Sequence, residues 1–216
     1  FATAADEAES RLGRVDLLFN NAGIAPASVA SELRYEKWDL ALGVNLTGVI
    51  NGIQTFLPRM IERGEGGYVV NTSSGAGLVA SANVLYVTTK FAVVGLSESL
   101  RQALDGHGID VSVLCPGPVD TGILHNTRSA HAGLSSGVGD DALKDAEAFL
   151  KGGADIDSVG ETVIAGMEAR AMWIHTDDGM RPYVRMRMES LLDSIPAPAT
   201  TTSTTTPAAP AIDEGS

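Results

Sequence analysis

Two residues near the middle of the chain, Tyr86 and Lys90, have the types and the spacing of an acid–base pair. Residues four positions apart lie on the same face of a helix, so their side chains can meet. A phenol with its usual pKa near ~10 is a poor base at neutral pH, and a nearby ammonium group favours the phenolate and lowers that pKa. The pair can therefore serve general acid–base catalysis. Taken alone, the same spacing is more typical of surface packing.

Ser74 and Asn45 are two further polar residues whose positions suggest chemistry. Ser74 lies 12 residues before Tyr86 in a Gly- and Ser-rich run. Its hydroxyl could donate a hydrogen bond to a carbonyl or a developing oxyanion, or it could belong to a plain turn. Asn45 interrupts an apolar helical stretch, and a buried amide needs partners. Those partners are either the backbone or a bound water that feeds a proton path.

Two short segments complete the set of candidate ligand contacts. Residues 20–23 read Asn-Asn-Ala-Gly, and residues 116–121 read Pro-Gly-Pro-Val-Asp-Thr. Side-chain amides and the Thr121 hydroxyl can bind a ligand, while Asn, Gly and Pro are also common turn formers. Each segment thus has a functional and a purely structural interpretation.

The elements that must position these residues are predicted from hydrophobic patterning. Apolar, β-branched runs predict strands, and the first three are continuous rather than alternating, as in strands buried on both faces of a parallel sheet. Longer stretches between them predict helices, with Ser158 and Glu161 spaced as a capping box. The expected strands are residues 15–19, 68–72, 111–115 and, more weakly, 173–176, and the expected helices are residues 36–62, 85–104 and 158–170.

This alternation of strands and helices predicts an α/β protein with a doubly wound, three-layer parallel sheet of the Rossmann type. Residues 20–23, Ser74 and residues 116–121 each follow a predicted strand at its carboxyl end. That edge is where open α/β sheets bind their ligands. The order and placement of these residues therefore carry more weight than any of them alone.

The combination resembles the short-chain dehydrogenase/reductase family over about residues 1–190. The matching motifs occur in the family's order: NNAG at 20–23, VNLTG at 44–48, NTSSGAG at 71–77, Y-x-x-x-K at 86–90 and PGPVDT at 116–121. The resemblance implies a catalytic tetrad of Asn45, Ser74, Tyr86 and Lys90. Tyr86 would exchange the proton, Ser74 would position the substrate carbonyl, Lys90 would bind the nicotinamide ribose and lower the tyrosine pKa, and Asn45 would hold a relay water.

The resemblance also implies NAD or NADP as cofactor and a small carbonyl or secondary alcohol as substrate. Ser74 and Tyr86 would contact that substrate. The implied cofactor-binding residues are Asn20, Ala22, Gly23, Tyr86, Lys90, Pro116, Gly117, Val119 and Thr121. The sequence gives no preference between NAD and NADP.

The family's glycine-rich pyrophosphate loop has no equivalent in residues 1–216. The NNAG strand is normally the fourth of the sheet, so two or more βαβ units, roughly 60 residues, would precede it. With the start at Phe1 rather than Met, we expect a fragment that lacks the first βαβ units. The leading hypothesis is a nicotinamide-dependent oxidoreductase. The alternatives are a non-catalytic binding or oligomerisation module on the same fold, and a related isomerase or epimerase.

Composition narrows the class of partner. Asp and Glu total 27 against 15 Lys and Arg, a net charge of −12 that repels nucleic acid and anionic membrane surfaces. The lone Cys115 cannot form an internal disulfide, which indicates a reducing compartment. No apolar run approaching ~18 residues and no signal peptide are recognised, so we expect a cytoplasmic protein. The four histidines form no ligand cluster, and we predict no metal.

The chain divides into two predicted parts. Residues 1–194 form the C-terminal part of the catalytic domain, and residues 195–216 form a disordered tail rich in Pro, Thr and Ala. Residues 125–155, rich in Gly, Ser and Asp, are interpreted as a mobile insertion with one short possible helix. The helices from Trp38 and from Leu85 are apolar beyond the one face that a sheet can cover, which predicts a homodimer or homotetramer.

Overall fold

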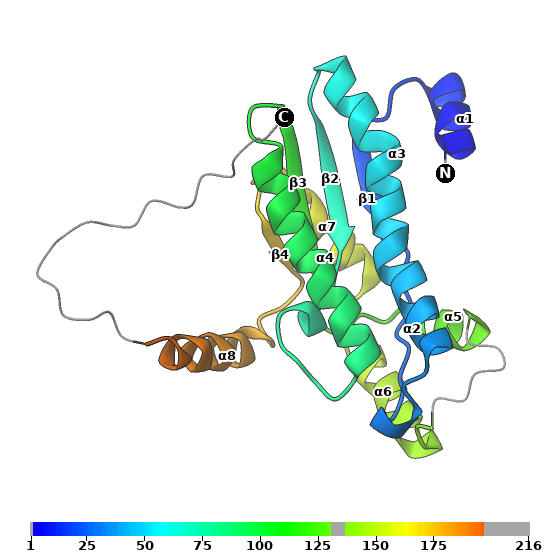
Figure 1. The fold of residues 1–216 in the computed structure, drawn as a ribbon, viewed down its shortest axis with the longest axis vertical. Coiled ribbons are helices and arrows are strands. Elements are labelled where there is room, and N and C mark those ends of the chain that lie inside the picture. The colour runs from blue at the N-terminus through cyan, green and yellow to red at the C-terminus, as the bar shows by residue number, and fades with distance from the viewer. Residues whose placement is uncertain (1, 131–136, 197–216) are drawn as a thin grey trace, which may run out of the picture.

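The computed structural model describes residues 2–130 and 137–196, which contain one four-stranded sheet (Figure 1). The strand order is β1-β2-β3-β4, and all three neighbouring pairs are parallel. The strands are β1 (Leu17–Asn20), β2 (Gly67–Thr72), β3 (Ile109–Cys115) and β4 (Trp173–His175). Every strand expected from the sequence is present, and the prediction of a doubly wound α/β fold is confirmed.

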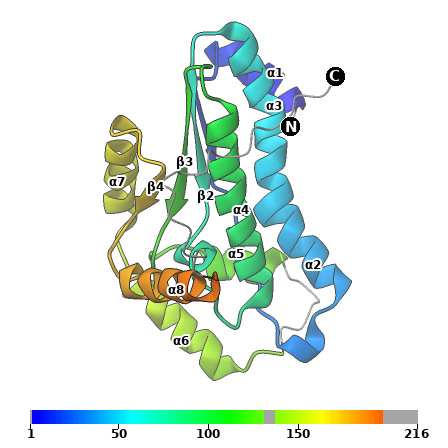
Figure 2. The same ribbon diagram turned by 60° about the vertical axis from the view of Figure 1, so that its left-hand side comes forward.

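Helices cover the sheet on both faces and make three layers (Figure 2). On one face α3 (Gly48–Arg63) and α4 (Val84–Ala103) pack over the sheet, with Ile53 and Val93 in the same buried cluster as Val111. On the other face α7 (Ile156–Glu168) covers β3 and β4, where Val163 meets Leu114. Because all neighbouring strands are parallel, the carboxyl ends of the four strands lie at one edge of the sheet.

Strand β1 differs from the expectation of a strand buried on both faces. Leu18 is buried beneath α3, while Leu17 and Phe19 on the opposite face are 52% and 50% exposed. No helix among the described residues covers that face at β1, because α7 lies over β3 and β4. The alternating burial is that of an edge strand.

The helix expected at residues 36–62 is a longer, composite element. It comprises α2 (Tyr35–Leu42), a π-helical segment (Gly43–Thr47) and α3, and Pro58 lies inside α3 without ending it. Over Tyr35–Arg63 it is long and apolar enough to cross a membrane, so the expectation of no such run is wrong. A core helix passes the same test, and this one packs on β1 and α4.

Three features of the secondary structure were missed or misplaced by the sequence analysis. Asp155, not Ser158, caps α7: its carboxylate accepts hydrogen bonds from the backbone N–H groups of Asp157 and Ser158. Two helices occupy residues 125–155, where one was considered, and helices at both ends were not foreseen. The additional helices are α1 (Ala2–Leu12), α5 (Ile123–Ala130), α6 (Asp140–Lys151), α8 (Arg181–Ser194) and two short 3-10 turns (Ala30–Glu32 and Gly75–Gly77).

The predicted boundary between domain and tail coincides with the end of α8 at Ser194. Residues 197–216, the main part of the predicted tail, lie outside the described residues. The disorder of that segment therefore stays a prediction.

Candidate active site

Asn45 lies 1% exposed in the π-helical turn between α2 and α3, and its side chain is fully engaged. Its Oδ1 accepts from the Ile24 N–H at 2.9 Å, and its Nδ2 donates to the Ile24 carbonyl oxygen at 2.9 Å and to Thr89 Oγ1 at 3.1 Å. Both backbone groups of Ile24 are thus paired with one amide. Wide π turns are frequent at functional sites. This one holds the segment after residues 20–23 against α4.

Tyr86 and Lys90 lie on the first turns of α4, which begins after the cap residue Asn83. The Lys90 ammonium nitrogen lies 5.6 Å from the centre of the Tyr86 ring. Lys90 is 3% exposed, and Nζ donates to the Thr72 carbonyl oxygen at 3.0 Å, its one acceptor within residues 2–130 and 137–196. An ammonium group has three N–H donors. Two of them therefore remain for other partners.

The two adjacent serines after β2 have different surroundings. Ser73 is buried, and its hydroxyl donates to the Lys90 carbonyl oxygen at 2.8 Å. Ser74 is only partly buried, accepts from the Ala76 N–H at 3.1 Å and lies close enough to the Tyr86 side chain to lower its pKa. The structure therefore brings Ser74, rather than Ser73, to the tyrosine hydroxyl.

Burial dominates the proton equilibria of this cluster. Burial raises the pKa of Tyr86, and the neighbouring Ser74 hydroxyl opposes that rise. This direction is opposite to the one expected from the neighbouring ammonium group, because loss of water disfavours the phenolate. Burial lowers the pKa of Lys90 to about 8, with Cys115 opposing, and raises the pKa of the Cys115 thiol to about 12. Lys90 can therefore change charge near neutral pH.

Residues 20–23 divide into an inward and an outward part. The Asn20 Nδ2 donates to Asn71 Oδ1 at 2.8 Å, and Asn71 in turn donates to Ser97 Oγ at 3.0 Å. The Asn20 side chain also fills the space over Gly52, so it is engaged inside the protein rather than offered to a ligand. Ala22 is exposed. A Cβ at Gly23 would lie 3.5 Å from both Asn45 Oδ1 and Lys90 Nζ, so Gly23 adjoins the cluster.

The segment of residues 116–121 is held at the same edge of the sheet. The Pro116 carbonyl accepts from the Gly75 N–H, and the Gly117 N–H donates to Thr176 Oγ1 at 3.0 Å. Val119 is buried and bridges Ala154. Thr121 is exposed. The structure thus places the four tetrad candidates, Gly23 and residues 116–117 around one edge.

Three neighbours of the cluster were missed by the sequence analysis. Thr89 bonds both Asn45 and the Tyr86 carbonyl oxygen, and Thr72 supplies the acceptor for Lys90. Thr127 on α5 accepts from the Ala25 N–H at 2.8 Å. Polar residues inside apolar runs were the available signal for Thr72 and Thr89. Nothing local marks Thr127, whose partner lies 102 positions away.

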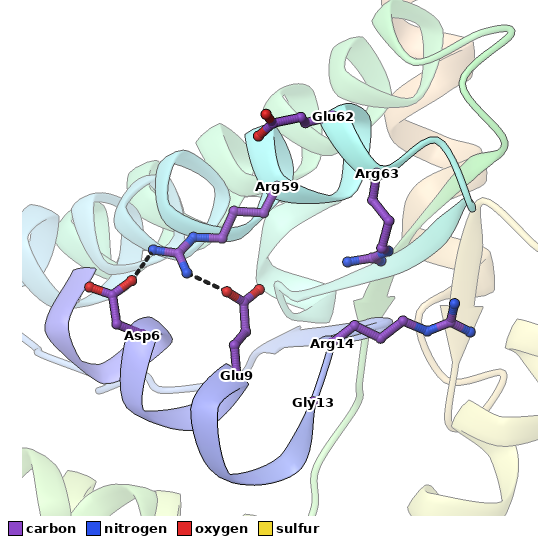
Figure 3. A pocket seen from close by; sticks show the side chains of 7 residues that line it. All are labelled: Asp6, Glu9, Gly13, Arg14, Arg59, Glu62 and Arg63. Atoms are coloured by element: carbon purple, nitrogen blue, oxygen red, sulfur yellow. Dashed lines mark hydrogen bonds and ion pairs between the residues drawn. The ribbon is translucent and has the colours of Figure 1, made fainter.

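A separate hollow lies at the opposite, amino edge of the sheet, between α1 and the end of α3 (Figure 3). Arg59 there binds Asp6 and Glu9, and Arg14 and Arg63 lie beside it. None of the tetrad candidates lines it. Within residues 2–130 and 137–196, no group of three or more His, Cys, Asp or Glu side chains could hold a metal ion.

The fold and the cluster together define a three-layer α/β protein with a buried tyrosine–lysine pair at the carboxyl edge of its parallel sheet. The family of short chain dehydrogenases matches residues 1–132 of the chain. The chain therefore belongs to this family.

Individual relatives and solved structures agree with this assignment. A C alpha-dehydrogenase from Sphingobium sp. (strain NBRC 103272 / SYK-6) is 33% identical over 200 residues, covering 90% of this chain and 66% of the relative. A D-threitol dehydrogenase from Mycolicibacterium smegmatis is 38% identical over 142 residues, covering 65% of this chain and 52% of the relative. The chain thus spans about two thirds or less of the length of these relatives.

A structure of a short chain dehydrogenase/reductase from Burkholderia phymatum in complex with NAD has a TM-score of 0.82 at 30% identity. The superposition covers 93% of this chain and 75% of the Burkholderia phymatum chain. A putative short-chain dehydrogenase from Novosphingobium aromaticivorans has a TM-score of 0.75 at 37% identity, with 93% of this chain and 65% of that chain covered.

Proposed function

We propose that the protein is an NAD(P)-dependent oxidoreductase that interconverts a secondary alcohol and a carbonyl compound. The observation that carries this proposal is Tyr86 with the Ser74 hydroxyl beside its side chain and the Lys90 ammonium 5.6 Å from its ring. Support for an alcohol substrate comes from the D-threitol dehydrogenase among the relatives. Support for the cofactor comes from the NAD complex of the Burkholderia phymatum structure and from an NADP complex of a Burkholderia cenocepacia gluconate 5-dehydrogenase.

Tyr86 is the proposed general acid and base. In the direction of oxidation, its phenolate accepts the proton of the substrate hydroxyl while hydride leaves the carbon that bears this hydroxyl for the nicotinamide, and reduction reverses both transfers. Ser74 donates a hydrogen bond to the same substrate oxygen, which stabilises the negative charge that develops there. Because the pKa of Tyr86 is raised by burial, the tyrosine is protonated at neutral pH in the unliganded protein, ready for reduction.

Lys90 and Asn45 hold the surroundings of the tyrosine. The two remaining N–H donors of Lys90 fit ribose hydroxyls, and Gly23 leaves the space beside them free of a side chain. Asn45 fixes Ile24 and, through Thr89, the turn of α4 that carries Tyr86. When bound, the nicotinamide supplies or accepts the hydride.

The remaining cofactor contacts are proposed for the two segments that flank the cluster. Backbone groups of Asn20, Ala22 and Gly23 would line one side, while Pro116, Gly117, Val119 and Thr121 would line the other. Thr121 is exposed and its hydroxyl can bind a ligand, whereas Gly117 and Val119 are already held by Thr176 and Ala154. Gly117 and Val119 therefore shape the segment through their backbone, and Thr121 is the residue with a side chain that can bind the cofactor.

Substitution Tyr86→Phe in the gene product that contains this chain tests the proposal. It keeps the ring and its packing and removes the ionisable oxygen. We expect turnover, followed by nicotinamide absorbance over a panel of secondary alcohols and ketones, to fall by about 100-fold or more, with cofactor affinity nearly unchanged. Tyr35→Phe, at a tyrosine that is 85% exposed, is the matched control and should keep full activity. A Tyr86→Phe variant with a near-normal rate would refute the assignment.

A homodimer or homotetramer built on α3 and α4 is part of the same proposal. Ile50 and Ile61 on α3 and Val84 on α4 remain about one-third exposed, on faces that the sheet does not cover. Light scattering with and without residues 196–216 tests both the assembly and the expectation that the tail is dispensable. A cytoplasmic location is likewise proposed, since the Cys115 thiol is buried and has no disulfide partner.

A further inference from the structure

Helix α8 is the least covered element among the described residues. None of its residues is buried, and Tyr183, Met186, Leu191 and Leu192 are all exposed, Met186 and Leu192 by 61% and 64%. In Figure 1 the helix extends away from the sheet. Helices of about this length are marginal in water without tertiary packing. A surface that covers α8 is therefore expected.

The inner side of α8 contacts the body of the protein at its first half only. The Arg187 guanidinium lies 5.0 Å from the centre of the Phe91 ring on α4. Met180, just before the helix, packs so closely on Gly75 that a Cβ there would lie 2.8 Å from Met180 Cγ. These contacts fix which side of α8 faces inward and leave the opposite side free.

That free side carries a regular pattern of charge. Arg181, Arg185, Glu189 and Asp193 follow one another at every fourth position, so they lie along one face of the helix. The amino half of this face is basic and the carboxyl half is acidic. Within residues 2–130 and 137–196, none of the four makes an ion pair. Leu192 and Met186 lie beside them.

We propose that the partner of α8 is the α8 of a second copy of this chain, packed antiparallel about a two-fold axis. In the register centred on Arg187, Arg181 lies opposite the partner's Asp193 and Arg185 opposite the partner's Glu189. The same register sets Leu192 opposite the partner's Pro182, and both flank the charged face of the helix. Arg187 itself is turned toward Phe91, so the centre does not place two free cations together.

Charge complementarity favours a second copy over other partners. The chain has a net charge of −12, so two copies repel each other on most of their surfaces and can associate only through a face that is locally complementary to itself. A face that is basic in one half and acidic in the other is complementary to itself after a two-fold rotation. A helix of 14 residues spans about 21 Å, which makes the contact smaller than the interface of ~1,600 Å² typical of stable complexes. We therefore expect an association of its own in the micromolar range, or one that joins dimers into tetramers.

Charge reversal in single chains and in mixtures tests the contact. In Arg185→Glu, the new carboxylate of each copy faces the partner's Glu189, and in Glu189→Arg two guanidinium groups meet. We expect each variant alone to associate about tenfold more weakly by sedimentation over a range of concentrations. A mixture of the two variants pairs an acidic face with a basic face and should regain at least wild-type affinity. Like charges within each helix persist in the mixture, so only the contact between copies can restore it.

A disulfide across the register supplies a second, independent readout. Chains with Arg185→Cys and chains with Glu189→Cys, mixed and mildly oxidised, should form more disulfide-linked dimer than either variant alone, because the register sets these two positions opposite each other. The natural Cys115 is buried and does not compete. Glu7→Cys and Arg11→Cys on α1 are the matched control, since they are another exposed acidic–basic pair four residues apart, and should give none.

The outcomes separate the possible partners of α8. Unchanged association in every variant shows that α8 lies outside any contact between copies and overturns the proposal. Weakening in the single variants without recovery in the mixture assigns α8 to a different surface of the second copy and overturns the antiparallel pairing. None of these measurements depends on catalytic activity, so they stand whatever becomes of the proposed oxidoreductase function.

Discussion

The two edges of the sheet carry similar polar residues in opposite environments. At the amino edge, Arg59 binds Asp6 and Glu9 in a hollow open to water, with the three side chains 30%, 67% and 28% exposed (Figure 3). At the carboxyl edge, Asn45 and Lys90 are 1% and 3% exposed. Both edges are rich in hydrogen bonds. Only the second buries its central polar side chains away from water.

The difference in burial decides what each edge can do. Hydrogen bonds to Asp6 and Glu9 raise the pKa of Arg59, so the guanidinium stays charged throughout the accessible pH range. Burial lowers the pKa of Lys90 to about 8, close to neutral pH. A fixed charge can hold elements together, whereas a group that titrates near neutral pH can take part in proton chemistry. Desolvation, rather than residue type, gives the two clusters their different proton equilibria.

The largest expected effect is that of Asn45→Ala at the buried edge. The substitution leaves the N–H and carbonyl of the buried Ile24 without partners and removes the bond to Thr89. We expect the free energy of unfolding, measured in urea, to fall by about 3 kcal/mol. The exposed Asn51→Ala on α3 is the control and should change it little. Equal effects of the two variants would contradict the role given to burial.

A smaller effect is expected for Thr127→Val, which removes the acceptor of the Ala25 N–H and keeps the shape of the side chain. The free energy of unfolding should fall by about 1 kcal/mol, and the Ala25 amide should exchange its hydrogen faster. Thr127→Ser, which keeps the hydroxyl, should restore slow exchange, and Ser129→Ala on the same helix should not disturb it. Unchanged exchange in Thr127→Val would show that this contact does not hold α5 in solution.

The titration of Lys90 makes the free energy of unfolding depend on pH by an amount similar to the effect expected for Thr127→Val. Its folded pKa of about 8 lies below its ordinary value of 10.5, so between these limits the unfolded chain binds more protons and stability rises with pH. Between pH 8 and 9 the contribution is about 1 kcal/mol. The raised pKa of Cys115 makes stability fall with pH from about pH 9 upward and so opposes the effect of Lys90. The variant Lys90→Met keeps Cys115 and therefore shares this opposing effect with the wild type. The difference between the urea-unfolding curves of these two proteins isolates Lys90, and parallel curves would refute the shift.

The smallest effect is expected at the open edge, for Arg59→Gln. The lost ion pairs are exposed and screened by salt, so the unfolding midpoint should move less than in any variant above. High salt should abolish even that difference, while it should leave the loss in Asn45→Ala in place. A large, salt-resistant loss on removing Arg59 would show that the two edges do not differ as their exposure indicates.

Strongly apolar elements were predictable from the sequence, and elements that gain little burial were not. The bounds of strands β2 and β3 and of helix α4 were predicted within two residues, because their apolar runs are stable only when they are buried in the core. Helices α6 and α8 have no buried residue, so neither carries an apolar run that the core requires, and α6 was covered only by the one short helix considered within residues 125–155. At α7 the capping-box spacing of Ser158 and Glu161 marked the helix start three residues too late, because the Asp155 carboxylate accepts the free N–H groups of the first turn.

The sequence by itself determined the family and the order of the strands along the chain, and it predicted the tetrad candidates, because all three rest on local motifs at fixed spacing. The tertiary structure alone decided how those residues behave. Packing buried Tyr86 and raised its pKa against the expected direction, chose Ser74 over Ser73 as its partner, and turned Asn20 inward to Asn71. Each of these outcomes depends on how much water reaches a side chain and on which distant groups surround it. Residues far apart in the chain fix both, and no local pattern records them.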